Sequence, residues 1–183
     1  TDSLKVYFRV GSAEYDPTYR SNRERMDSFI KRVYDVEQDS LNFTIFQVEY
    51  TAAASPEGAV HFNKTLSERR FQSILNYLKS HLDVSDKLVV SQVLGEDWEK
   101  VAELVEQSHL SNKSEILSII RDNTLSFENK EKAIKALDKG KTWNYMLRRL
   151  YPELRYCEVT VHVGEIIPTP LWVHQNPIQN FES

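Results

Sequence analysis

The order of β-rich and helical segments limits the folds open to this chain. Segments 5–10, 42–52 and 87–95 are rich in β-branched and aromatic residues, and apolar residues at helical spacing fill the intervals between them. A fourth β-rich segment, 154–164, comes much later. Strand–helix–strand connections join parallel strands of one sheet. We therefore predict an α/β (α+β) domain with the order β-α-β-α-β-(helical insertion)-β, in which helices cover one face of a mixed four-stranded sheet.

Local signals predict where the first two helices begin. Asp16 followed by Pro17 suits a helix start, because the Asp16 carboxylate can accept an N-cap hydrogen bond and Pro17 has no N–H to leave unpaired in the first turn. Thr65 and Glu68 have the spacing of a capping box, and the apolar pattern that follows predicts a long helix reaching about Leu82.

Residues 97–150 depart from this alternation, because they contain only segments with helical spacing. One of these segments begins with Asn112 and Glu115 at capping-box spacing. We expect a helical lobe inserted between the third and fourth strands. The lobe has three aromatic residues at helical positions, Trp98, Trp143 and Tyr145. They are better explained as part of the lobe core than as a sugar-binding platform.

The C-terminal residues follow neither pattern. We assign 1–165 to one domain and predict an extended arm over 166–183, because proline is excluded from central strands and helix interiors and this segment contains Pro168, Pro170 and Pro177. The arm is unusually apolar, and we predict that five of its residues pack on the sheet edge or on a partner: Ile166, Ile167, Leu171, Trp172 and Val173.

Composition narrows the classes of function. The net charge is −4, whereas nucleic-acid-binding proteins usually carry a basic excess, so we expect no nucleic-acid partner. No apolar run approaches the roughly 20 residues of a membrane span. The single Cys157 excludes an internal disulfide and a cysteine-based zinc cluster, and we expect it to be a buried, inert thiol. Nucleophile–base motifs and metal-ligand spacings are missing, so we expect no enzymatic activity, cofactor or metal site.

The segment 53–71, AASPEGAVHFNKTLSERRF, carries the most specific pattern in the chain. It resembles the OmpA-like family, the peptidoglycan-associated C-terminal domain of outer-membrane protein A. In that family a strand ends in Gly-His-Thr-Asp, and then come Gly, Asn and Leu-Ser-x-x-Arg-Ala at a helix start. The second glycine, the asparagine and the Leu-Ser-x-x-Arg residues fall here, without a gap, on Gly58, Asn63, Leu66, Ser67 and Arg70.

The resemblance covers residues 4–96 and 151–164, while the 97–150 lobe stands where the family has a short loop. The Ala-Ser-Pro-Glu-Gly turn and the insertion resemble the version found in Bacteroidetes surface proteins. The resemblance implies a non-enzymatic domain in the periplasm or at the outer membrane of a Gram-negative bacterium. It also implies binding of the diaminopimelate in peptidoglycan stem peptides, in which an acid holds the ligand ammonium and Arg70 its carboxylate.

The chain departs from the family at the acidic half of this site. The ligand-binding aspartate of the family falls on Ser55, and the aspartate that ends its first strand falls on Arg9. The alanine after the key arginine is Phe71 here. These changes make the predicted pocket more cationic, and Glu57 or Glu14 is close enough in sequence to replace the acid.

Two functions therefore stay open. In the first, the chain is a wall anchor whose pocket is formed by Arg70, Asn63, Ser55, Gly58 and Arg9. In the second, which we prefer, the pocket is altered and the chain is a scaffold whose lobe and arm bind protein partners; a Phe71 side chain filling the pocket would favour this.

The same residues also have purely structural explanations. Asn63 can fix the preceding turn through its side chain, and Gly58 can be required for a positive φ. Arg69 and Arg70 can be solvated charges on a helix.

Overall fold

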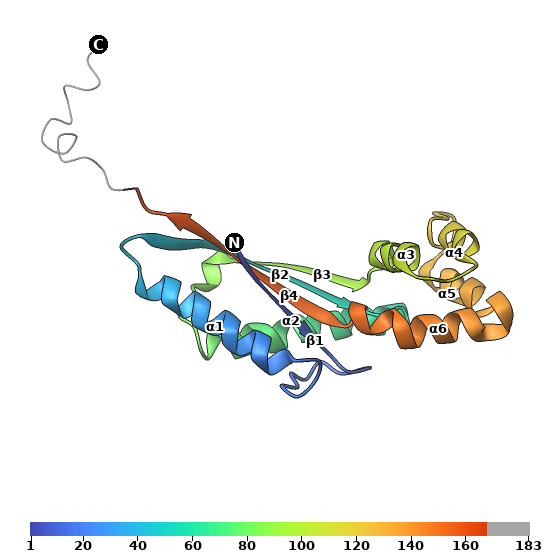
Figure 1. Ribbon diagram of the computed structural model, residues 1–183, viewed down its shortest axis with the longest axis horizontal. Helices are drawn as coiled ribbons and strands as arrows, with labels where there is room; N and C mark the ends of the chain where they lie inside the picture. Colours follow the sequence, from blue (N-terminus) through green and yellow to red (C-terminus); the bar gives the residue numbers. More distant parts are fainter. Residues whose placement is uncertain (168–183) are drawn as a thin grey trace, which may run out of the picture.

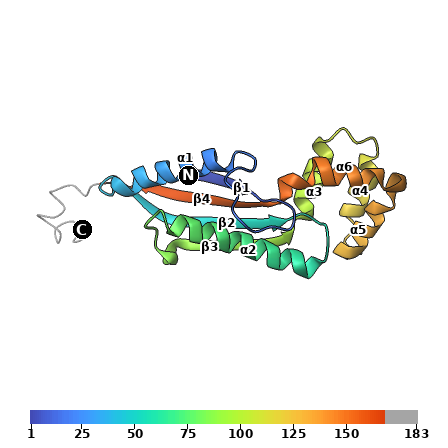
Figure 2. The ribbon, with the colours of Figure 1, turned by 90° about the horizontal axis from the view of Figure 1, so that it is seen from below.

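A four-stranded sheet and a helical lobe at one end of it make up residues 1–167, which the computed structural model describes (Figure 1, Figure 2). The strands are β1 (Asp2–Tyr7), β2 (Phe43–Ala54), β3 (Val89–Glu96) and β4 (Tyr156–Glu165). Their order in the sheet is β1-β4-β2-β3; β2 and β3 are parallel, and β4 is antiparallel to both of its neighbours. The predicted mixed four-stranded sheet is confirmed, and its last strand lies between the first and the second.

Two long helices, α1 (Asn22–Gln38) and α2 (Val60–Lys79), cover one face of the sheet and lie below it in Figure 1. Their apolar residues and the inward-facing strand residues form one core, which includes the fully buried Phe29 and Ile74. Cys157 lies in this core, and burial raises the pKa of its thiol. A buried thiol of this kind is inert, as the sequence indicates.

The start of α1 differs from the prediction, because the helix begins at Asn22 and not at Asp16. The Asp16 carboxylate accepts hydrogen bonds from the backbone N–H and the hydroxyl of Thr18, at 2.9 and 2.6 Å, and closes a turn instead of capping a helix. Arg20 and Ser21 then adopt left-handed angles, with φ of 46° and 59°, which a right-handed helix cannot include.

The start of α2 also differs from the prediction. The helix begins at Val60, and its N-cap residue, Ala59, makes no side-chain cap hydrogen bond. Thr65 therefore lies inside the helix, where its hydroxyl donates to the carbonyl of His61 at 3.2 Å. The predicted capping box of Thr65 and Glu68 is wrong, because tertiary contacts of the preceding turn, described below, fix the helix start further upstream.

The lobe joins β3 to β4 and contains α3 (Trp98–Gln107), α4 (Lys113–Ile120), α5 (Phe127–Lys135) and α6 (Lys141–Arg149). The short 3₁₀ segments of the chain are η1 (Asp86–Leu88) before β3, η2 (Leu137–Gly140) before α6 and η3 (Tyr151–Leu154) before β4. The lobe has a core of its own, in which Trp98 and Trp143 are buried and Tyr145 is partly buried. The expected role of these aromatic residues in the lobe core is confirmed.

Asn112 occupies the N-cap position of α4 but does not form the predicted capping box with Glu115. Its side-chain amide donates instead to the hydroxyl of Thr142 at 2.8 Å, next to the start of α6. A tertiary hydrogen bond thus replaces the local one.

The predicted arm falls largely outside the described residues, including Leu171, Trp172 and Val173. Of the described part, Ile166 donates its backbone N–H to the carbonyl of Asn42 at 2.7 Å, while Ile167 is 85% exposed. The Ile167 side chain therefore does not pack on the sheet edge formed by the described residues. Within residues 1–167, every helix is too short or too polar to cross a bilayer.

Candidate functional site

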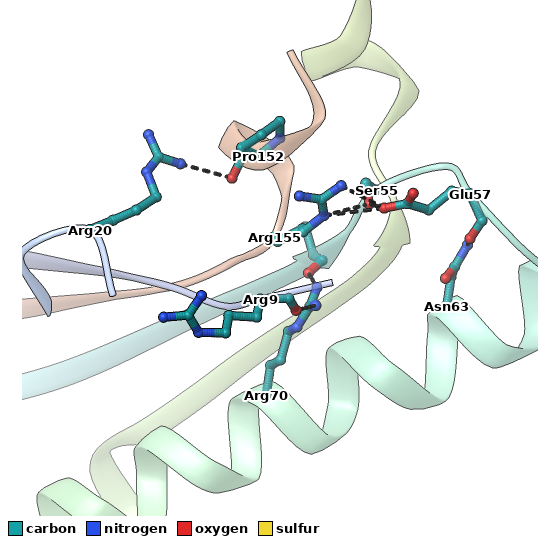
Figure 3. Close-up of polar contacts among 9 residues, drawn as sticks. Arg9, Arg20, Ser55, Glu57, Asn63, Arg70, Pro152 and Arg155 are labelled. Atoms are coloured by element: carbon teal, nitrogen blue, oxygen red, sulfur yellow. Dashed lines mark hydrogen bonds and ion pairs between the residues drawn. The ribbon is translucent and has the colours of Figure 1, made fainter. Parts of the chain in front are cut away.

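The predicted site residues come from segments that meet at one edge of the sheet. Because β1, β2 and β3 run in the same direction, their carboxyl ends share this edge, and the antiparallel β4 begins there. The loop after β1, the turn after β2, the first turns of α2 and the residue before β4 thus converge (Figure 3). The site depends on this topology rather than on one contiguous motif.

Arg70 lies on α2 at the centre of this edge and is completely buried, with 0% of its surface exposed. Its guanidinium donates to three backbone carbonyls, those of Ser12 and Ala53 at 2.9 Å each and that of Arg9 at 3.3 Å. Burial, together with the charge of nearby Arg155, lowers the pKa of Arg70 to about 10. Arg70 is therefore not the solvated helix charge that its position in the sequence allows; it ties α2 to the loop after β1 and to the end of β2.

Ser55, Glu57 and Arg155 form a second polar cluster beside Arg70 (Figure 3). The Arg155 guanidinium donates to Oε1 of Glu57 from Nη2 at 2.7 Å and from Nε at 3.1 Å, and the hydroxyl of Ser55 donates to the same oxygen at 2.5 Å. Arg155 is buried, whereas the Glu57 side chain is 28% exposed. Glu57 thus supplies a carboxylate next to the position where the family resemblance places an aspartate, but Arg155 neutralises it.

Asn63 connects the turn after β2 to the lobe. Its side-chain amide donates to the carbonyl of Glu57 at 3.0 Å and to Oε2 of Glu96 at 2.9 Å. The other oxygen of Glu96 accepts from Nε1 of Trp98 at 3.0 Å, and burial raises the pKa of the Glu96 carboxyl. The predicted role of Asn63 in fixing the turn is confirmed, and the same side chain is linked through Glu96 to Trp98, the first residue of α3.

Gly58 lies in this turn with a φ of 83°, a left-handed angle that favours glycine. A Cβ atom at this position would meet no other atom within 4 Å, so the requirement is conformational and not one of space. The predicted need for a positive φ at Gly58 is confirmed.

The Arg9 side chain does not join the other predicted site residues. It points away from Arg70 in Figure 3, pairs with Asp16 at 2.8 Å, lies over the ring of Tyr19 at 4.6 Å and is 58% exposed. Only its backbone carbonyl contributes, as an acceptor for Arg70. Phe71 also lies elsewhere: it packs edge-on against Tyr50, at 5.2 Å between ring centroids, in the core between α2 and the sheet. Phe71 therefore does not fill the pocket, and the support that a filled pocket would have given to the altered-pocket function is absent.

The site contains residues that the predicted pocket omits. Arg155 and Glu96 have signals in the sequence, because each lies in a segment that resembles the family, but their roles arise only from contacts across the sheet edge. Ser67 is a third case: its hydroxyl accepts from the backbone N–H of Gly95 at 3.0 Å and donates to the carbonyl of Lys64 at 2.9 Å. The Leu-Ser-x-x-Arg pattern thus joins α2 to the ends of β2 and β3.

Chemically, the edge is an internal network of paired polar groups. Both buried guanidiniums donate to protein acceptors, and the exposed part of the Glu57 carboxylate is the group most open to a ligand. No three His, Cys, Asp or Glu side chains are grouped as metal ligands among residues 1–167.

Several solved structures are similar to this chain in fold, and they include the two that follow. One is the OmpA-like domain of FopA1 from Francisella tularensis, at 15% identity and a TM-score of 0.45, covering 90% of this chain and 75% of that one. The other is the peptidoglycan-associated lipoprotein from Burkholderia pseudomallei, at 15% identity and a TM-score of 0.38, covering 51% and 70%. No protein-family model and no curated protein sequence matches the chain. Both TM-scores lie below 0.5, so neither likeness establishes a function here.

Proposed function

We propose that this chain is a non-enzymatic cell-envelope domain of the OmpA-like type whose peptidoglycan pocket has become an internal structural network. It works as a scaffold or protein-interaction module in the periplasm or at the outer membrane of a Gram-negative bacterium, in a Bacteroidetes-type surface protein. The lobe of residues 97–150 and the C-terminal arm are its partner-binding parts.

The buried state of Arg70 carries this proposal. A diaminopimelate carboxylate needs guanidinium N–H groups that face an open pocket. The Arg70 guanidinium is withdrawn from solvent and donates to three backbone carbonyls. Breaking these bonds to admit a ligand would remove three hydrogen bonds from a charged donor, each of which contributes about 1.5–3 kcal/mol.

The Glu57 carboxylate supports the alternative function, a wall anchor. It lies two residues after Ser55, is partly exposed, and has Asn63 hydrogen-bonded to its own backbone carbonyl. In this arrangement Glu57 would hold the ligand ammonium in place of the aspartate that the family resemblance expects at Ser55.

Calorimetric titration with diaminopimelate and with a stem peptide that contains it separates the two functions. A scaffold gives no saturable heat up to millimolar ligand. A wall anchor gives saturable binding that is lost in Glu57→Gln and kept in Glu68→Gln, a matched removal of one exposed carboxylate on α2.

Arg70→Ala is a poor control for this titration, because it removes three buried hydrogen bonds and threatens the fold. Thermal unfolding of each variant shows that the titrated protein is native. Saturable stem-peptide binding that depends on Glu57 would overturn the scaffold proposal.

A further inference from the structure

A cleft of about 770 Å³ lies between the end of β3 and the lobe. One wall is α3, and the other is the segment from the end of α4 into α5. The volume falls within the roughly 300–1,000 Å³ of typical ligand sites. The cleft is distinct from the buried network at the sheet edge, and Glu96 is the residue that the two share.

The floor of the cleft is apolar and aromatic. Trp98 and Phe127 lie next to each other there, with ring centroids 6.1 Å apart and ring planes tilted by 46°, beside Ala102 and Ile120. The Trp98 indole is held in place by its hydrogen bond to Glu96, while Phe127 is partly exposed. Such a floor suits aliphatic stems and the flat face of a guanidinium.

The α3 wall is acidic. Glu99, Glu103 and Glu106 recur at helical spacing, are exposed and line the same cleft. Like charges at this spacing repel, and the last two lie near the C-terminal end of α3, whose last turn has no basic residue. The helix therefore gains stability from any cation that binds along this face.

The lysine and arginine side chains near this wall leave its carboxylates largely available to a ligand. Glu103 pairs with Lys100 and Glu106 with Arg121 through partly exposed ion pairs, which are worth only about 0–1 kcal/mol each. Glu99 makes no ion pair within residues 1–167. Lys130 also lines the cleft, but its ammonium donates to the carbonyl of Ile120 at 2.6 Å and so caps the end of α4.

We propose that this cleft binds a peptide segment of a protein partner in which arginine or lysine alternates with apolar residues. The inference rests on the proposed scaffold function and names the surface and the partner chemistry that it uses. The basic groups of the segment lie along Glu99 and Glu103, and its apolar side chains lie on the Trp98–Phe127 floor. A charge-complementary wall beside an apolar floor is the pattern expected of a specific peptide site.

The test measures binding of fluorescein-labelled acetyl-Leu-Arg-Leu-Arg-Leu-amide to the full chain by anisotropy at low salt. The comparison peptide has citrulline in place of arginine, which keeps the shape and removes the charge. The double variant Glu99→Gln/Glu103→Gln is expected to bind the arginine peptide about tenfold more weakly, since each exposed ion pair contributes up to about 1 kcal/mol. Phe127→Ala, a change at a partly exposed ring, is expected to weaken binding as well.

The matched control is Glu68→Gln/Glu115→Gln, which removes the same charge from exposed positions outside the cleft and should bind like the unaltered chain. Three results would each overturn the inference: no saturable binding of the arginine peptide, equal binding of the citrulline peptide, or equal weakening in the control variant. The stem-peptide titration reports on the Glu57 edge, so its outcome is independent of this one.

Discussion

The substitution Arg70→Met tests whether the Arg70 side chain stabilises the fold or is available to bind a ligand. Methionine keeps the apolar part of the arginine stem, but it is shorter, lacks the guanidinium and can donate no hydrogen bond. The change therefore removes the three bonds to the carbonyls of Ser12, Ala53 and Arg9. It also removes the contact of the guanidinium with the ring of Phe8, 5.2 Å from its centroid.

The size of the effect follows from these contacts. A hydrogen bond from a charged donor contributes about 1.5–3 kcal/mol, and three are lost. Part of this is offset, because methionine does not carry the cost of burying a charge. We expect a net loss of about 4 kcal/mol in the free energy of unfolding, which lowers Tm by roughly 8–16 °C in a chain of this size.

Urea unfolding followed by circular dichroism gives this free energy, with Arg69→Met as the matched control. Arg69 is the next residue along the chain and is exposed on α2, so its replacement should change stability by less than about 0.5 kcal/mol. If Arg70→Met proved as harmless as Arg69→Met, the three carbonyl contacts would not be the role of Arg70, and the argument for a lost pocket would fail.

Two further predictions concern the turns that frame the site. Gly58→Ala should destabilise the chain by about 1 kcal/mol in urea unfolding, because alanine is strained at a φ of 83°, although the space around it is free; an unchanged midpoint would contradict this. Hydrogen bonds from Thr18, and then from Arg9, lower the pKa of Asp16 to about 2. Since the folded-state pKa lies below the unfolded value of about 3.9, the contribution of Asp16 to stability is present above that pH and is lost as the pH falls through about 2. Asp16→Asn should therefore flatten the decline of stability in this window, and a carboxyl titration by NMR near pH 4 would refute the assignment.

The network at the sheet edge also links the two halves of the chain. Asn63 binds both the Glu57 carbonyl and Glu96, and Glu96 binds Trp98 at the start of the lobe. The turn that would form one wall of a family-type pocket is thus fastened to the lobe that carries the acidic cleft.

Much of the architecture is determined by sequence-local properties. The alternation of β-rich and helical segments predicts the mixed sheet, its helical layer and the inserted lobe, because the period of the apolar residues depends on local geometry alone. The positive φ at Gly58 and the role of Asn63 in fixing the turn are likewise predicted from the local sequence. The errors fall at helix starts: Asp16, Thr65 and Asn112 each have good capping chemistry, but each side chain makes a different hydrogen bond.

The tertiary structure decides which polar groups of the candidate pocket are paired with each other. The family resemblance assigns both Arg70 and Ser55 to the pocket. The sequence does not reveal that three carbonyls from two other segments surround the Arg70 guanidinium. It also cannot place Arg155, which lies a hundred residues after Ser55, against Glu57. Those contacts exist because β4 returns from the lobe to lie between β1 and β2, and so begins at the edge where the parallel strands end. The sequence by itself thus determined the elements and the chemical groups available to the site, and the strand order decided which of those groups pair with each other and which stay open to a partner.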